Sequence, residues 1–288
     1  MYKIGIVGKG FVGAAVAQGF SAGTGYKSEI RVFDKDPSKS SHSLDEVVSE
    51  SDFIFISVPT PSNQDGSIHL TILEECINDI NHSSIKNEVH GSIILIRSTV
   101  VPGTTRAIQE KFPELNFVFN PEFLTERSAL FDFINQARFI LGGKKEHTKL
   151  VKDLYEDRFG QTATVIETDF ETAELTKYVC NTFFATKISF LNEMKLISDK
   201  LGTNWEDIME GFLRDGRIGH SHTNVPGHDG KNGFGGSCFP KDIKALIHYG
   251  DTIGIDMAVL KGVWETNLKV RPEKDWEDLL GRSVISDD

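Results

Sequence analysis

The chain has 288 residues, of which 39% are hydrophobic, and its formal net charge is −11. This is enough for one large or two ordinary globular domains, and the charge argues against broad nucleic-acid binding. No apolar run approaches the ~20 residues of a membrane span, and the N-terminus has a strand pattern instead of a charged leader, so we expect a cytoplasmic protein.

The first predicted strand, residues 2–7, runs directly into a glycine-rich turn that opens a helical pattern. The turn reads Gly8-Lys9-Gly10-Phe11-Val12-Gly13. Its glycines allow a tight turn and the close approach of a pyrophosphate, whose charge meets the helix N-terminus. A second predicted strand ends in Asp34, about 20 residues later, where an acid binds ribose hydroxyls and repels a 2′-phosphate. The pattern predicts NAD, and the alternative is a glycine turn beside a surface aspartate.

Strand and helix patterns continue to alternate to residue 159. The strands are expected at residues 30–33, 53–58, 92–97, 117–119 and 138–141, and the helices at residues 71–80, 103–111 and 146–159. A parallel sheet with helices on both faces, an α/β fold of the Rossmann type, accounts for this order. Ligands bind beyond the carboxyl ends of such strands. The turns there are expected to form the cofactor and substrate rim: Pro59 and Thr60, Ser98 and Thr99, and residues 120–126.

The second half is predicted to be helical. One long helix begins near Asp169, so we place the domain boundary before it, with an NAD-binding domain at 1–167 and a smaller all-helical domain at 168–288. Thr203 is expected to cap the next helix. A last helix is expected from Met257 to Leu268, and the mixed-charge tail after it is expected to add little to the core.

Two stretches of the sequence suggest acid–base or electrostatic roles. Glu122 follows Asn-Pro at a strand exit and can point into the cleft as a general base, although most surface carboxylates are only solvated. Glu174, Lys177 and Asn181 share one face of the long helix. A lysine on a helix is most often solvated, but an asparagine one turn away in an apolar segment indicates a polar stripe that faces a cleft.

The loop between the second and third predicted helices of this half is rich in glycine and histidine. His220, His222 and His228 precede Asp229, and their spacing matches no established metal-site pattern. We predict no metal and favour a polar loop that contacts substrate.

Cys238 lies in the stretch Gly233-Phe234-Gly235-Gly236-Ser237-Cys238-Phe239-Pro240-Lys241-Asp242. The glycines allow close approach to a ligand, and Pro240 followed by an apolar run predicts the first turn of a helix. The helix N-terminus and Lys241 favour the thiolate, which is the nucleophilic form. The alternative is a buried structural cysteine. Three widely spaced cysteines form neither a disulfide framework nor a zinc cluster.

Taken together, these stretches resemble the nucleotide-sugar dehydrogenase family that includes UDP-glucose 6-dehydrogenase and GDP-mannose 6-dehydrogenase. The matching motifs cover almost the whole chain: residues 8–13, Ser98-Thr99-Val100, Asn120-Pro121-Glu122-Phe123-Leu124, Glu174-Leu175-Thr176-Lys177 with Asn181, Arg217-Ile218-Gly219, and residues 233–242. The resemblance implies the oxidation of a sugar primary alcohol to a carboxylate, which consumes two NAD⁺.

The resemblance also implies roles for single residues. Cys238 would trap the aldehyde, Glu122 would be the base for thioester hydrolysis, and Lys177 would stabilise oxyanions. Asn181 and Asp242 would hold the catalytic water and Lys177, and Thr99 would relay the alcohol proton. The expected cofactor contacts are Gly8, Gly10, Phe11, Val12, Gly13, Asp34, Pro59, Thr60, Ser98, Thr99, Glu126 and Lys241. The expected substrate contacts are Glu122, Phe123, Leu124, Lys177, Asn181, Ile188, Arg217, Lys231 and Gly235.

Three further expectations concern partners and departures from the family. Arg217 resembles the arginine that the family inserts into a neighbouring subunit, which implies a homodimer through the helical domain. The chain resembles a short form without the family's C-terminal UDP-binding domain, and the segment 220–232 is longer than usual. We expect His222 and Lys231 in that segment to close over the substrate phosphates. A dehydrogenase for another nucleotide sugar and a non-catalytic NAD-binding module are the alternative functions.

Overall fold

The computed structural model describes residues 1–285, which form two compact units. The first unit contains Met1–Thr60 and Leu70–Lys177, and the second contains Pro61–His69 and the chain from Tyr178 onward. The long helix α7 (Phe170–Leu201) contributes residues to both units. The functional boundary expected between residues 167 and 168 stays a prediction. Within residues 1–285, no helix is both long and apolar enough to cross a membrane.

The first unit is built on a seven-stranded sheet with the strand order β2-β1-β3-β4-β5-β6-β7. The neighbours from β2 through β5 pair in parallel. The strands are β1 (Lys3–Val7), β2 (Glu29–Phe33), β3 (Phe53–Ile56), β4 (Ile93–Ile96), β5 (Asn116–Phe119), β6 (Phe139–Gly143) and β7 (Val165–Thr168).

The expectation of a wholly parallel sheet is wrong at one pair of strands. β6 pairs antiparallel to β5, with Phe119 opposite Gly142, and β7 then pairs parallel to β6. Because the two strands are antiparallel neighbours, the chain that connects them starts and finishes at the same end of the sheet and does not have to cross a face of it. Gly142 permits close packing here, because a Cβ on it would lie 2.6 Å from Ala173 Cβ. Half-exposed β7 has no alternating pattern and was not predicted.

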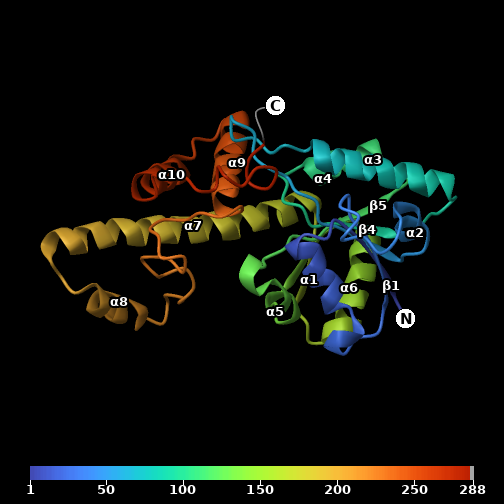
Figure 1. The fold of residues 1–288 in the computed structure, drawn as a ribbon, viewed down its shortest axis with the longest axis horizontal. Coiled ribbons are helices and arrows are strands. Elements are labelled where there is room, and N and C mark those ends of the chain that lie inside the picture. The colour runs from blue at the N-terminus through green and yellow to red at the C-terminus, as the bar shows by residue number, and fades with distance from the viewer. Residues whose placement is uncertain (286–288) are drawn as a thin grey trace. The chain divides into compact units, whose positions relative to one another are not determined.

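Helices cover both faces of this sheet (Figure 1). On one face lie α2 (Leu44–Ser49), α3 (Thr71–Lys86) and α4 (Thr104–Lys111), and on the other lie α1 (Phe11–Gly19), α5 (Ala129–Ile134) and α6 (Lys145–Phe159). The fully buried strand β3 feeds both layers, because side chains alternate along a strand. Ile54 and Ile56 join one apolar cluster, and Phe53 and Phe55 join the other.

The second unit is predominantly helical, as predicted. Beside its part of α7 it contains α8 (Trp205–Leu213), α9 (Phe239–Thr252) and α10 (Ala258–Val270). Thr203 is not the cap of α8, because its hydroxyl bonds to Ser198 instead. Asn204 is the cap, and its side-chain oxygen accepts hydrogen bonds from the backbone N–H groups of Glu206 and Asp207.

The segment after α10 contributes to the core, contrary to expectation. Trp276 is only 1% exposed and its ring lies 5.3 Å from that of Trp264. Ser62 N–H donates to Ser283 O over 2.8 Å, and Ile285 N–H donates to Ser62 O over 3.2 Å. A single tryptophan in a charged stretch forms no periodic pattern, so the sequence did not predict the burial of Trp276. The rest of the expected tail, residues 286–288, lies outside the described residues.

Candidate functional site

The glycine-rich turn of the first unit has the geometry that a dinucleotide needs. Gly8 has a φ of +88° and donates its N–H to Phe33 O over 2.9 Å. A Cβ on Gly13 would lie 2.0 Å from Gly8 O, so only glycine fits there. Gly10 begins α1 without a side-chain cap, and a Cβ on it would meet nothing within 4 Å. The helix N-terminus is therefore open to a phosphate group.

Asp34 lies beside this turn, as predicted. Its Oδ2 accepts a hydrogen bond from Lys9 N–H over 2.6 Å, and its Oδ1 accepts one from Asp36 N–H over 2.9 Å. These bonds fix the carboxylate where β2 ends. A carboxylate held next to an open phosphate-binding turn can accept hydrogen bonds from ribose hydroxyls.

The two rim turns after β3 and β4 are joined by side-chain hydrogen bonds. Thr60 Oγ1 donates to Thr99 O over 2.8 Å, and Ser98 Oγ donates to Val58 O over 2.7 Å. Both donors are buried, whereas Thr99 is half-buried and Pro59 is exposed. Of the predicted rim residues, Thr60, Ser98 and Thr99 thus belong to one connected surface of the first unit.

A buried ion pair joins two residues that are far apart in the sequence. Lys177 Nζ lies 3.0 Å from Glu122 Oε1 and also donates to the backbone oxygen of Glu122 over 2.5 Å. Glu122 Oε2 accepts the N–H of Leu124 over 2.7 Å, and Lys177 Nζ lies 5.4 Å from the centre of the Phe123 ring. Glu122 and Lys177 are only 5% and 3% exposed. Charges buried in this way are retained only when they are paired.

Glu174 does not join this pair, although the helical spacing placed it on the same polar stripe. Its carboxylate accepts the N–H groups of Gly103 over 2.6 Å and Thr105 over 2.8 Å, where α4 begins. Burial raises the pKa of Glu174 to about 7. Glu174 is therefore a cap for α4, a role that side-chain spacing on α7 alone could not indicate.

Cys238 is the N-cap residue of α9, and Pro240 lies in the first turn of that helix, as predicted. The thiol is half-buried, with Ser237 Oγ 3.8 Å from Sγ. One turn later, the buried Asp242 accepts Asn181 Nδ2 over 2.6 Å at Oδ2 and Lys241 Nζ over 2.6 Å at Oδ1. Lys241 was expected to contact the cofactor. In the second unit it is buried against Asp242, and its cofactor role stays a prediction.

Three residues that were not predicted hold the glycine loop before Cys238. Asn192 Oδ1 accepts Gly233 N–H over 3.1 Å, and Asn267 bonds to both backbone groups of Phe234. A Cβ on Gly235 would lie 2.5 Å from Arg271 Nη2, so the loop is packed directly against this guanidinium. The signal that could have identified Asn192 and Asn267 is a buried amide within a largely apolar helix.

Of the remaining predicted substrate residues, two lie near the Cys238 loop: the His222 ring is 5.4 Å from the ring of Phe239, and Lys231 shares Asp275 with Arg271. Arg217 is exposed and paired with Asp215, and Ile188 is half-buried on α7. Lys231 Nζ lies 3.1 Å from Asp275 Oδ2, and the His222 ring stacks on Phe184 at 4.2 Å. Exposed Glu126 begins a short 3₁₀ turn in the first unit. In the described part of the chain, no group of three His, Cys, Asp or Glu side chains is placed to hold a metal.

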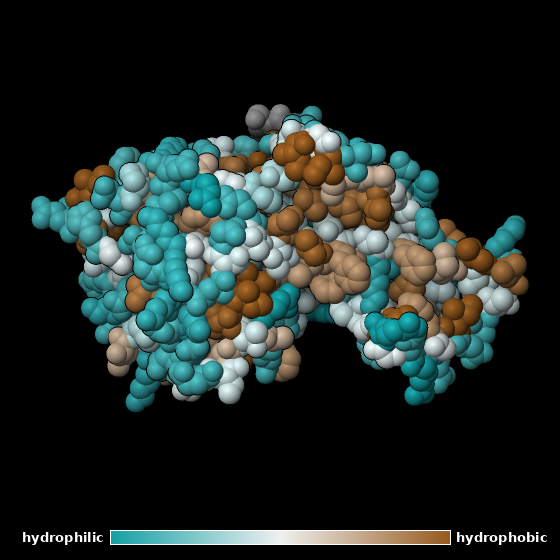
Figure 2. Space-filling model, turned by 180° about the vertical axis from the view of Figure 1, so that it is seen from behind, coloured by the Kyte–Doolittle hydropathy of each residue, from teal (hydrophilic) through white to brown (hydrophobic). Residues whose placement is uncertain are grey.

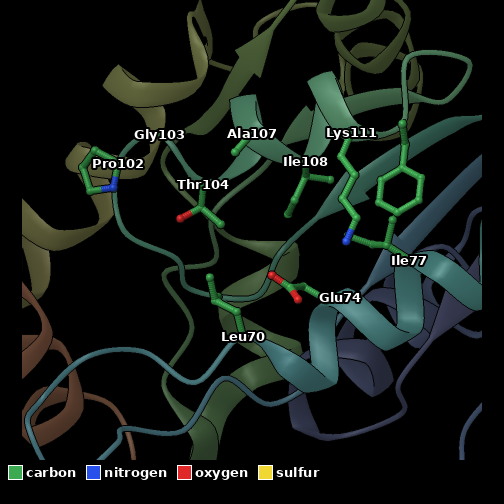
Figure 3. Close-up of a pocket in the computed structure, with 10 residues that line it drawn as sticks. Leu70, Glu74, Ile77, Pro102, Gly103, Thr104, Ala107, Ile108 and Lys111 are labelled. Atoms are coloured by element: carbon green, nitrogen blue, oxygen red, sulfur yellow. The ribbon is translucent and has the colours of Figure 1, made fainter.

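A cavity of about 420 Å³ in the first unit lies elsewhere, between α3 and α4 (Figure 3). Its walls are largely apolar, with Leu70 and Ile108 among them, and Glu74 and Lys111 add one charge of each sign. None of its lining residues was predicted as a site residue. The predicted catalytic and cofactor-binding side chains are therefore not gathered around this cavity.

Two family models match the chain. One describes the NAD binding domain of the UDP-glucose/GDP-mannose dehydrogenase family at residues 31–158, and the other describes its central domain at residues 171–269. The chain belongs to the UDP-glucose/GDP-mannose dehydrogenase family. The NAD-binding description confirms NAD as the predicted cofactor, and the glycine turn with Asp34 fits it.

Members of this family resemble the chain in sequence and in structure. A UDP-glucose 6-dehydrogenase of Rickettsia prowazekii is 39% identical over 77% of this chain and 50% of its own length. A second UDP-glucose 6-dehydrogenase, TuaD of Bacillus subtilis, is 34% identical over 77% of this chain and 47% of its own length. The chain thus spans about half the length of these relatives.

A solved structure supports the same assignment. The UDP-glucose dehydrogenase of Pyrobaculum islandicum superposes with a TM-score of 0.82 at 31% identity, covering 93% of this chain and 68% of that one. This agreement confirms the predicted Rossmann-type sheet followed by a helical region.

Proposed function

We propose that this chain oxidises the 6-hydroxymethyl group of a nucleotide sugar to a carboxylate. The substrate that we favour is UDP-glucose. The observation that supports this best is the half-buried Cys238 at the start of α9, one turn before the buried Asp242. A helix N-terminus lowers the free energy of the thiolate, the form that attacks an aldehyde carbon. The names of the similar proteins support UDP-glucose as the substrate.

The first oxidation converts the alcohol to an aldehyde. NAD⁺, when bound, would supply the oxidant for each of two rounds by accepting two electrons and the C6 hydrogen as hydride. In our proposal Thr99 relays the hydroxyl proton as the C6–H bond breaks. Lys177 supplies a cation for the negative charge that develops on the oxygen. Phe123, Leu124 and Ile188 would form the apolar surroundings of the sugar.

The second oxidation proceeds on the sulfur atom. The Cys238 thiolate adds to the aldehyde carbon, and the new C–S bond gives a thiohemiacetal whose remaining C6–H bond breaks to leave a thioester. Asn181 and Asp242 hold the attacking water, and Glu122 removes its proton as the C–S bond is cleaved. The products are the sugar carboxylate and the free thiolate.

The stoichiometry of NADH formation tests the proposed function. Purified protein is incubated with excess NAD⁺ and a limiting amount of UDP-glucose, GDP-mannose or a UDP-N-acetylhexosamine. We expect two NADH per UDP-glucose and far slower reaction with the others. One NADH per sugar would indicate a plain alcohol dehydrogenase, and a better rate with another sugar would correct the substrate. No NADH with any of them, despite NAD⁺ binding, would support a non-catalytic module.

We further propose that two copies of the chain associate through α7. The exposed side chains Phe183, Phe190 and Ile197 recur every seven residues, so they lie along one face of this helix. They are 63%, 49% and 52% exposed. Figure 2 shows that apolar patches lie among the polar side chains on the face of the molecule that it presents. An apolar stripe of this length is typical of a helix-to-helix interface. Exposed Arg217 would then reach the sugar of the neighbouring copy.

Replacing Phe190 with Glu is expected to convert the dimer to a monomer, because each copy would bury an unpaired carboxylate in an apolar interface. Sedimentation velocity at micromolar protein measures the mass. Phe131→Glu is the matched control, since Phe131 is 68% exposed on α5 of the first unit and should leave the dimer intact. A wild-type monomer, or an unchanged Phe190→Glu dimer, would contradict the proposed interface.

A further inference from the structure

A second buried cation lies in the first unit, immediately after β4. Arg97 is only 2% exposed and, among residues 1–285, its hydrogen-bond partners are an amide and a hydroxyl, with no carboxylate. Its Nη1 donates to Asn120 Oδ1 over 2.5 Å, and Tyr155 OH lies 3.5 Å from the same nitrogen. Nε and Nη2 have no hydrogen-bond partner in the described part of the chain. The guanidinium carbon lies 5.8 Å from the centre of the Phe133 ring. Burying a charge without a carboxylate partner is unfavourable, so its retention points to a role besides packing.

Asn120, which accepts the hydrogen bond from Arg97, also forms hydrogen bonds with three other residues. Asn120 Oδ1 also accepts Tyr155 OH over 2.5 Å, and Asn120 Nδ2 donates to Ile140 O over 2.9 Å. The backbone N–H of Asn120 donates to Ile96 O over 2.9 Å. Burial raises the pKa of Tyr155 to about 12, so its hydroxyl keeps the proton that it donates. Asn120 therefore links several elements: β4, β5, β6 and α6.

Asn120 is followed by Pro121 and then by Glu122, the carboxylate of the buried ion pair. Proline fixes its own φ and restricts the residue before it, so little backbone freedom separates Asn120 from Glu122. We therefore expect the position of the Asn120 side chain to determine that of the Glu122 carboxylate. Lys177, which bonds to both the side chain and the backbone of Glu122, depends on the same turn.

We propose that Arg97, Asn120 and Tyr155 form a clamp that positions Glu122 and Lys177 for catalysis. None of the three is a catalytic residue, because each acts through the turn that carries Glu122. The inference rests on the proposed function for its effect on rate, but the clamp itself can be detected without activity.

Tyr155→Phe tests the clamp, since it removes one hydroxyl and leaves the ring in place. We expect kcat to fall about 10- to 100-fold, as for a small misplacement of a catalytic group, with KM for NAD⁺ and sugar within about twofold. Amide hydrogen exchange of residues 120–126 should become faster, as measured by mass spectrometry. Tyr26→Phe is the control, because Tyr26 OH bonds to Asp157 in the same unit. It should change neither kcat nor this exchange.

Asn120 provides the conservative comparison. Asn120→Asp keeps an acceptor for Arg97 and Tyr155, so it should retain most of kcat. Asn120→Leu removes the acceptor, and its kcat should be at least about tenfold lower than that of Asn120→Asp. Unchanged exchange of residues 120–126 in Tyr155→Phe would overturn the clamp, whatever the rate. Faster exchange with unchanged kcat would overturn its catalytic role. If the wild-type protein forms no NADH, the proposed function fails, and the exchange measurement still decides whether the clamp exists.

Discussion

Replacing Cys238 with Ser is expected to stop the reaction before the second oxidation. A hydroxyl at the start of α9 stays protonated at neutral pH, so it is a far weaker nucleophile than the thiolate that this position favours. Formation of two NADH per sugar should slow at least about 10³-fold, which corresponds to a loss of roughly 4 kcal/mol of transition-state stabilisation. The serine keeps the volume and the N-cap position, so folding should be preserved.

The rate is measured as NADH released in a single turnover, and intact-mass spectrometry measures the sugar attached to the protein. Cys180→Ser is the matched control, because Cys180 is also half-buried but lies on α7 away from any helix start. It should keep the wild-type rate. Full formation of two NADH by Cys238→Ser would exclude the thioester route, and loss of activity in both variants would point to a general sensitivity to serine.

The parts of the site that the sequence predicted are those encoded by a few neighbouring residues. Gly8, Gly10 and Gly13 follow a strand pattern, and Cys238 precedes a proline and an apolar helix, so short stretches determine these local geometries. The pairing of Glu122 with Lys177 lies across 55 positions. Spacing alone left open whether Lys177 was solvated, and the resemblance to a family suggested its role.

The parts that could not be predicted depend on tertiary contacts with no periodic signature. Glu174 shares the helix face of Lys177 in the sequence, but it binds backbone groups that α4 brings to it. Arg97 and Tyr155 meet Asn120 only because β4, β5 and α6 pack together. The antiparallel direction of β6 follows from a connection that returns through α5 to the same end of the sheet, and the residues of β6 do not encode it. Such features arise from packing between elements, which a local pattern does not record.

Replacing Glu122 with Gln is expected to allow both oxidations and to block the release of the product. The amide can still accept a hydrogen bond from Lys177, but it cannot take a proton from water. General base catalysis contributes about 10²- to 10⁴-fold, so thioester hydrolysis should slow by that factor. The enzyme should therefore release a burst of two NADH per active site and then retain the acyl group on Cys238.

Intact-mass spectrometry after the burst distinguishes this role from a structural one. A retained adduct with the mass of the oxidised nucleotide sugar is expected, and hydroxylamine should release it. Glu114→Gln is the control, since Glu114 is an exposed carboxylate of the first unit that is not among the predicted site residues. It should turn over without an adduct. Because Glu122→Gln also removes one charge of a buried pair, the melting temperature is measured alongside. Slow turnover without an adduct in a folded variant would mean that Glu122 acts before the thioester forms, and the hydrolytic role would be wrong.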